Sequence, residues 1–181
     1  MDFYISDLHF GHAAVLELCK RPFKDISEMN ETLGANWNAA VGARDTVYVV
    51  GDLFYRSETD PEDILRRLKG KKYLILGNHD KDWTGRVDLS KYFEDVRDII
   101  TVNCGRGNAT LCHFPMLFFE GKYHIYGHVH ARENFPHKAI LYSMENAFNA
   151  GADVNNFRPV TFDELIRNNY VLRSRELRRR S

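Results

Sequence analysis

Residues 46–52 read Thr-Val-Tyr-Val-Val-Gly-Asp, a β-branched and apolar run that stops at a glycine and an aspartate. This composition favours a buried strand, and Gly-Asp favours the turn that follows it. Two other stretches have the same build: Phe-Tyr-Ile-Ser-Asp-Leu-His at residues 3–9 and Tyr-Leu-Ile-Leu-Gly-Asn-His-Asp at residues 73–80. The three stretches predict buried strands that each end in polar side chains.

Helical segments separate these strands. Residues 13–19 have a helical composition that ends near Pro22, and Ser27 is positioned to cap a second helix that runs to about Val41. Asp60 and Pro61 open a third helix to about Leu68, with proline at the first helical position. Strands alternating with helices predict βα units in the first half of the chain.

The second half has a different pattern, with short apolar runs between Gly, Asn and Pro turns. We expect strands at residues 96–102, 109–112, 123–126 and 140–143. Thr161 and Glu164 form a capping box before a short helix. The whole order predicts an α/β fold in which helices lie outside a pair of sheets.

The bulk composition is that of one domain. The chain has 181 residues, 44% of them hydrophobic, which suffices for a single core. We expect a domain at residues 1–172 and a basic tail at residues 173–181. The composition and terminal position of the tail favour a solvated or frayed helix end over a segment that contacts phosphate. Acidic and basic residues balance at 25 each, so binding of long nucleic acid is not expected.

Three cysteines without a CxxC spacing argue against a disulfide framework and favour a reducing compartment. The first residues lack the basic and apolar regions of a signal peptide. No stretch approaches the roughly 18 apolar residues that a membrane helix needs. A cytoplasmic protein without a membrane partner is therefore expected.

The polar residues at the strand ends carry the chemistry. Ligands bind beyond the carboxyl ends of strands in open α/β sheets, so these side chains should converge. In the second half, His113 ends one expected strand, and His128 and His130 follow another; side chains two apart in an extended segment point the same way. Each cluster alone is an ordinary turn, but five of the eight histidines lie in such clusters. The candidate site residues in all clusters are Asp7, His9, Asp52, Asn78, His79, Asp80, His113, His128 and His130.

Mixed carboxylate, amide and imidazole donors suit Mn, Fe, Zn, Co or Ni better than Mg or Ca. No cysteine lies in the clusters, which argues against a closed structural zinc site. The seven candidate ligands are too many for one tetrahedral ion. Two ions about 3.5–4 Å apart that share one carboxylate would use them.

Five sequence blocks, in order, resemble the signature of the calcineurin-like metallophosphoesterases. They are Asp7-x-His9, Gly51-Asp52, Gly77-Asn78-His79-Asp80, His113 and Gly127-His128-x-His130. The resemblance spans about residues 3–130. The amino-acid sequences of segments 6–12, 21–23, 36–38 and 45–48 are similar to those of small single-domain bacterial and phage members of this family.

The resemblance implies a four-layer αββα sandwich of two mixed β-sheets and two divalent metal ions, most often Mn. It assigns Asp7, His9, Asp52 and His130 to the first metal, and Asp52, Asn78, His113 and His128 to the second. A hydroxide bridging the metals would be the nucleophile. His79 would be an acid outside the metal shell, and Asp80 would orient it. His12 and Arg56 are further candidates for substrate binding.

The sequence leaves the type of ester open. A phosphodiesterase acting on small diesters such as cyclic nucleotides is the favoured hypothesis. A phosphomonoesterase is one alternative, and a metal-binding docking module without activity is another. The eight intact metal and acid positions favour an enzyme. Its partner would be a small phosphate ester. The sequence is also compatible with an oligomer.

Overall fold

The three apolar runs form the centre of the first sheet. In the computed structural model, which describes residues 1–131 and 135–180, β1 (Asp2–Ile5), β2 (Thr46–Val49) and β3 (Lys71–Ile75) are parallel. β4 (Asp95–Arg97) adds a parallel edge, and β9 (Val160–Thr161) pairs antiparallel with β1. The strand order is β4-β3-β2-β1-β9.

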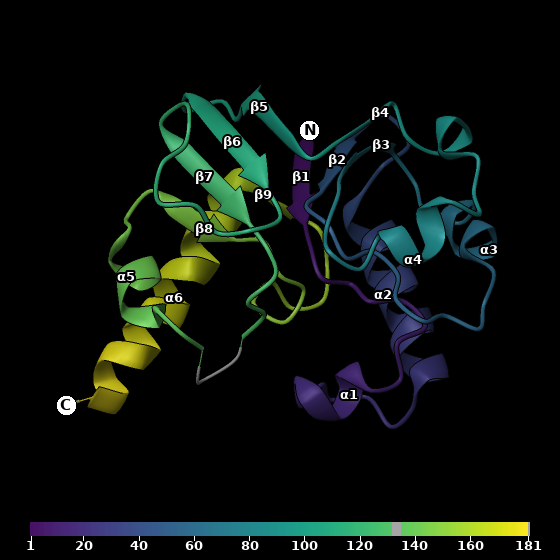
Figure 1. The fold of residues 1–181 in the computed structure, drawn as a ribbon, viewed down its shortest axis with the longest axis horizontal. Helices are drawn as coiled ribbons and strands as arrows, with labels where there is room; N and C mark the ends of the chain where they lie inside the picture. Colours follow the sequence, from purple (N-terminus) through teal and green to yellow (C-terminus); the bar gives the residue numbers. More distant parts are fainter. Residues whose placement is uncertain (132–134, 181) are drawn as a thin grey trace.

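A second sheet lies against the first (Figure 1). It contains β5 (Ile99–Asn103), β6 (Asn108–Cys112), β7 (Tyr123–Tyr126) and β8 (Ala147–Asn149), in that order. β5 runs antiparallel to β6, and the remaining pairs are parallel, so both sheets are mixed.

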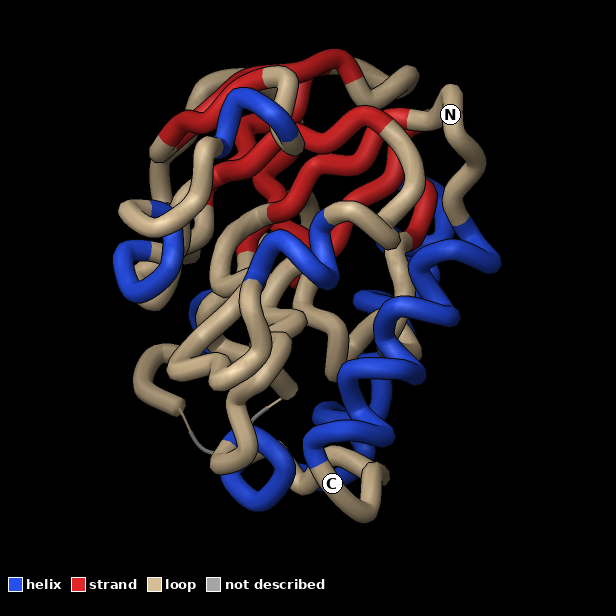
Figure 2. Tube along the Cα trace, turned by 90° about the vertical axis from the view of Figure 1, so that its right-hand side faces the viewer, coloured by secondary structure: helices blue, strands red, loops and turns tan. Residues whose placement is uncertain are grey.

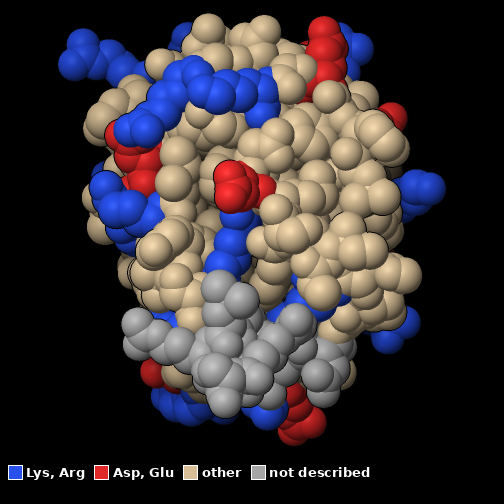
Figure 3. All heavy atoms as spheres, turned by 90° about the vertical axis from the view of Figure 1, so that its left-hand side faces the viewer, with Lys and Arg blue, Asp and Glu red and all other residues tan. Residues whose placement is uncertain are grey.

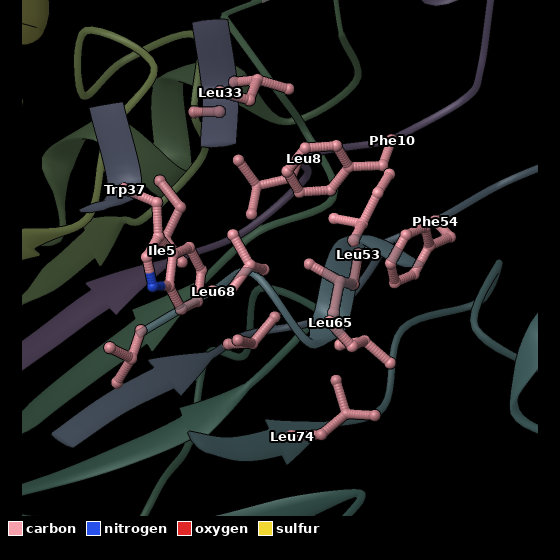
Figure 4. Close-up of a cluster of buried hydrophobic side chains, with 14 of the residues drawn as sticks. Ile5, Leu8, Phe10, Leu33, Trp37, Leu53, Phe54, Leu65, Leu68 and Leu74 are labelled. Carbon is pink, nitrogen blue, oxygen red and sulfur yellow. The ribbon is translucent and has the colours of Figure 1, made fainter. Parts of the chain in front are cut away.

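The period-two alternation of β1 separates two apolar layers. Phe3 and Ile5 pack on one face with residues of α2 (Ile26–Ala40) and α3 (Pro61–Leu65). Tyr4 points to the opposite face and packs with Leu111 and Ile125 of the second sheet. Figure 4 shows the helix-side layer, in which Trp37 and Leu33 face the strands.

The outer face of the second sheet is also covered. Leu141 of α5 (Lys138–Ser143) packs with Tyr126 and Ala147. The long α6 (Phe162–Arg180) contacts β8, β9 and β1. Short helical turns complete the fold: α1 (Val15–Leu18), α4 (Lys81–Thr84) and the 3₁₀ turn η1 (Leu89–Lys91). The expected αββα sandwich is confirmed.

Several local expectations were wrong. Residues 140–143 are helical: Leu141 is buried but Ile140 is half exposed, and a short apolar run does not distinguish strand from helix. The strand expected at residues 96–102 is two strands, because the chain crosses from the first sheet to the second at Asp98. Asp25, rather than Ser27, caps α2 by accepting from the Glu28 amide.

The C-terminal helix differs in length from the expectation. The Thr161–Glu164 capping box is present, but the helix that it starts has 19 residues. α6 continues across position 172, and Arg173 donates to the carbonyl of Ala147 and lies over the ring of Phe148. The side chains of residues 176–181, the rest of the expected tail, lie outside the described residues.

The three cysteines are free thiols. Within residues 1–131 and 135–180, no helix combines the length and the apolarity that crossing a bilayer requires. In Figure 2 the strands gather in the upper half of the molecule and loops fill the region below them, where the candidate site is built.

Candidate metal centre

The loops that follow β1, β2, β3, β6 and β7 converge at one end of the two sheets. A bridge between Ser6, after β1, and Gly151, after β8, ties the two sheets together at this end. Two groups of buried side chains bring their ligand atoms close together, with all atoms of a group within 4.8 Å of one another. Asp7, His9 and His130 form the first group, and Asp7, Asp52 and His113 form the second. The convergence expected from the strand ends is therefore present.

Asp52 lies between the two halves of the site. Its Oδ2 atom is 3.7 Å from His9 Nε2 and 3.3 Å from His113 Nε2. On the other carboxylate, Asp7 Oδ1 is 3.6 Å from His130 Nε2. Asn78 and His128 join the group that contains Asp52 and His113. Asn78 Oδ1 lies 2.9 Å from His128 Nδ1 and 3.1 Å from His113 Nε2. All seven predicted ligands are thus neighbours, with Asn78 and His128 on the exposed side.

The backbone at these positions is unusual. Five of the seven predicted ligands have a positive φ between 52° and 70°: Asp7, His9, Asp52, His128 and His130. Non-glycine residues rarely adopt this left-handed region, and such strain concentrates at functional sites. The surrounding structure stabilises it; for example, the His128 amide donates to both carboxylate oxygens of Asp7.

Two glycines allow the loops to approach the site closely. A Cβ at Gly77 would lie 2.3 Å from Asp52 Oδ1, and a Cβ at Gly127 would lie 2.6 Å from Asp7 Oδ2. Both positions therefore exclude any side chain while the carboxylates keep their places. This is the physical role of the glycines in the Gly-Asn-His-Asp and Gly-His-x-His blocks.

The chemistry of His9 fits a metal ligand. Its ring is buried, and neither ring nitrogen has a hydrogen-bond partner among the described residues. Burial lowers the pKa of His9 well below its usual value, which leaves a neutral imidazole with a free lone pair. A buried polar group without a partner is costly, and a cation bound by Nε2 would remove that cost.

The other donors also fit divalent cations. His113 directs Nδ1 to the carbonyl of Val50, which leaves Nε2 to face Asp52 and Asn78. Burial opposes charging of His113 and His130, but the neighbouring carboxylates raise the pKa of His113 to about 9 and that of His130 to about 10. Burial also opposes ionisation of Asp52, yet the contact with His113 holds its pKa at about 2. Without cations, protonated imidazoles therefore balance the buried carboxylates.

Asp80 has a different position from the one expected. It does not orient His79: its Oδ2 accepts from the amides of Asp52 and Gly77, and its Oδ1 accepts from Leu53 N and Trp83 Nε1. All four distances lie between 2.7 and 3.0 Å. Asp80 is fully buried, and burial raises its pKa although these donors act in the opposite direction. The carboxylate therefore joins the loop of Asp52 to the loop of Asn78.

His79 lies beside the predicted ligands rather than among them. Its ring centroid is 5.5 Å from that of His9 and 3.9 Å from that of Tyr55, and its amide donates to Asp52 Oδ1. Tyr55 was missed by the sequence analysis, since an aromatic residue after a strand has no distinguishing local pattern. Its ring supports the imidazole of His79 from one side.

A buried charged network was also missed. Asp153 accepts from His130 Nδ1 and from Arg21 Nε, both at 2.8 Å, and Arg21 also donates to the carbonyls of Asp7 and Leu8. Burial acts to raise the pKa of Asp153, but these partners lower it to about 2. Arg21 stood in the segment Arg-Pro-Phe at residues 21–23, whereas nothing in the sequence pointed to Asp153.

One thiol lies close to the predicted ligands and was not found by the sequence analysis. No cysteine lies in the strand-end clusters, yet Cys19 is within 4.8 Å of the ligand atoms of His130 and Asp153. The thiol comes from the end of α1, where the chain turns back toward Arg21.

His12 and Arg56 lie at the edge of the site. The His12 ring is 5.3 Å from that of His9 and 4.8 Å from that of Tyr55, and its buried Nδ1 has no partner among the described residues. The Arg56 guanidinium lies over the Tyr55 ring at 5.1 Å. Both residues line a cavity of about 490 Å³ next to the predicted ligands.

Comparisons with known proteins agree with this geometry. The profile of the calcineurin-like phosphoesterases matches residues 3–116. An uncharacterized protein of Methanocaldococcus jannaschii is 32% identical over 173 residues, which cover 91% of this chain and 89% of that protein. The gene 66 protein of Mycobacterium phage L5 is 30% identical over 159 residues, 71% of this chain and 76% of its own length.

A solved structure shares the fold. A protein of unknown function from Aquifex aeolicus has a TM-score of 0.72 and 24% identity, with 92% of this chain and 98% of that chain covered. The matched family range ends before the Gly127-His128-x-His130 block. The geometry of the site joins that block to the other four.

Proposed function

Because the chain belongs to the calcineurin-like phosphoesterase family and is a metal-dependent phosphoric ester hydrolase, we propose that it cleaves small phosphodiesters at a two-metal centre. The observation that carries the proposal is the convergence of six other side chains with oxygen and nitrogen donors around Asp52. His9 adds to this support, because it is buried and its two ring nitrogens have no hydrogen-bond partner among the described residues.

The proposed ligand sets share one carboxylate. Asp7, His9, Asp52 and His130 would hold one cation, and Asp52, Asn78, His113 and His128 would hold the other. The position of Asp52 between His9 and His113 supports its role as the bridge. When bound, two divalent cations supply an activated water at neutral pH and neutralise charge that develops on the phosphoryl oxygens. The mixed N and O donors favour Mn, with Fe, Zn, Co or Ni as alternatives.

The chain's own residues prepare the ester for cleavage. The ring of His79, half-buried and in contact with Tyr55, is held outside the ligand cluster, where it can give a proton to the leaving oxygen. Such a group contributes about 10²–10⁴ in rate. The His12 ring beside His9 and the Arg56 guanidinium over Tyr55 lie next to the predicted ligands, where they would contact a phosphate bound at the metal centre.

Small substrates suit this surface better than a polymer. The chain is neutral overall, and the face in Figure 3 shows both basic and acidic side chains scattered over a mostly uncharged surface. Non-specific binding of nucleic acid depends on contacts between clustered basic residues and phosphates. We also propose a cytoplasmic location, which the three free thiols support.

The test compares the Mn-loaded protein with its His79→Ala variant. We expect hydrolysis of bis-p-nitrophenyl phosphate and a slower reaction with p-nitrophenyl phosphate. With a cyclic nucleotide, whose leaving alcohol is a poor leaving group, His79→Ala should lose about 10²-fold or more in kcat. The loss should be smaller with the p-nitrophenyl esters, because p-nitrophenolate leaves without a proton. Both proteins should contain two metal ions per chain by elemental analysis. A wild-type protein that is inactive with two bound ions would support the docking-module alternative, and faster hydrolysis of the monoester would support a phosphomonoesterase.

A further inference from the structure

A cavity adjoins the predicted metal centre on the side of His12. Its volume is about 490 Å³, within the range of small-molecule sites. Its walls come from the start of the chain after β1, from α2, and from the segment that includes α3. His12 and Arg56 line this cavity; the His12 ring also lies beside the predicted ligand His9, and the Arg56 guanidinium lies over Tyr55, so the cavity adjoins the predicted metal centre.

The lining combines aliphatic and polar side chains. Ile26, which is half-buried, and the small exposed parts of Ile64 and Leu68 provide the aliphatic surface. Asn30 Oδ1 accepts from the Gly11 amide, which leaves the N–H donors of its side chain for another partner. Glu31 and Arg67 form a bidentate ion pair at 2.8 and 3.1 Å and supply a carboxylate and a guanidinium.

Gly34 keeps this space open. It lies in the middle of α2 and lines the cavity, where a glycine weakens the helix relative to alanine. A Cβ built at this position would meet only Arg67 Nη2, at 3.8 Å. Any larger side chain would therefore extend into the cavity rather than into packed core.

We propose that this cavity binds the nucleoside of a nucleotide phosphodiester whose phosphate lies at the metal centre. A nucleobase has flat apolar faces and hydrogen-bonding edges, which match an aliphatic wall flanked by amide, carboxylate and guanidinium groups. His12 and Arg56, at the junction, would contact the phosphate. This proposal rests on the proposed phosphodiesterase function and names its substrate class.

The test uses two esters that release the same chromophore. Mn-loaded protein is assayed with the p-nitrophenyl ester of thymidine 5′-monophosphate and with methyl p-nitrophenyl phosphate. The wild type should prefer the nucleotide ester, and Gly34→Leu should reduce the ratio of the two kcat/KM values about tenfold or more, chiefly through KM. Gly85→Leu is the matched control, because a Cβ at Gly85 meets nothing within 4 Å and this residue lies outside the cavity.

A binding measurement separates this proposal from the proposed function. Thymidine 5′-monophosphate should give a saturation-transfer NMR signal with the metal-free wild type and with Gly34→Ala, but not with Gly34→Leu; circular dichroism checks that each variant is folded. Binding that Gly34→Leu abolishes, in a protein that cleaves neither ester, would support the cavity and refute the phosphodiesterase. Equal kcat/KM ratios in wild type and folded Gly34→Leu, or no binding by the wild type, would overturn the cavity proposal.

Discussion

Asp80→Asn provides the sharpest test of how the site is held together. The Asp80 carboxylate accepts four hydrogen bonds, from three backbone amides and from Trp83 Nε1. Asparagine keeps one oxygen, which can serve two of these donors, and its NH₂ group faces the other two. Each buried donor without an acceptor costs about 1–3 kcal/mol, so the variant should lose about 2–6 kcal/mol of unfolding free energy.

This loss is a large share of the roughly 5–15 kcal/mol that stabilises a typical domain. It is measured by urea unfolding of the metal-free protein, with Asp63→Asn as the control, since the exposed Asp63 carboxylate pairs with the exposed Arg66 and such surface pairs contribute little. Because Asp80 joins the loops of Asp52 and Asn78, the variant should also bind fewer Mn ions. A stability change below about 1 kcal/mol, with full metal content and reduced kcat, would refute this reasoning and favour a direct effect on His79.

Two further predictions concern Asp153, which accepts from His130, and His124 in β7. Asp153→Asn should weaken the first Mn site about 10–100-fold in calorimetric titration, because His130 and Arg21 lose their shared negative partner; an unchanged dissociation constant would contradict this role. His124 is buried, and burial lowers its pKa below 6.5, so folding favours its neutral form and the metal-free protein should lose stability as the pH falls below 6.5. We expect the unfolding free energy of His124→Gln, measured by urea unfolding at pH 5–8, to fall less steeply with pH than that of the wild type. If the two proteins lose unfolding free energy in parallel, His124 does not cause the decline.

The strands of the first sheet and the predicted ligands were accessible from the sequence because their signals are local. β1, β2 and β3 are short apolar runs, and the polar residues follow each run directly. The parallel arrangement then places their carboxyl ends together, so adjacent sequence predicts adjacent space. The assignment of these side chains as metal ligands remains a prediction that the metal analyses will test.

The errors arose where a local pattern has two physical outcomes. Ile140 to Ser143 is short enough to be a strand or a helix, and its packing against β7 and β8 decides for the helix. The run from Val96 to Val102 continues without a clear break, yet its two parts pair with different sheets. Pairing partners from distant sequence determine such boundaries.

Long-range contacts also decide the surroundings of the metal centre. Arg21 and Asp153 are 132 positions apart, and Asp153 also accepts from His130, so the support of this imidazole depends on a contact between distant segments. Asp80 stands beside His79 in the chain, but its buried carboxylate binds amides near position 52 instead. A sequence specifies which groups are available for coordination. The hydrogen bonds that position these groups depend on the tertiary structure, because a buried carboxylate accepts from the donors that the fold places next to it.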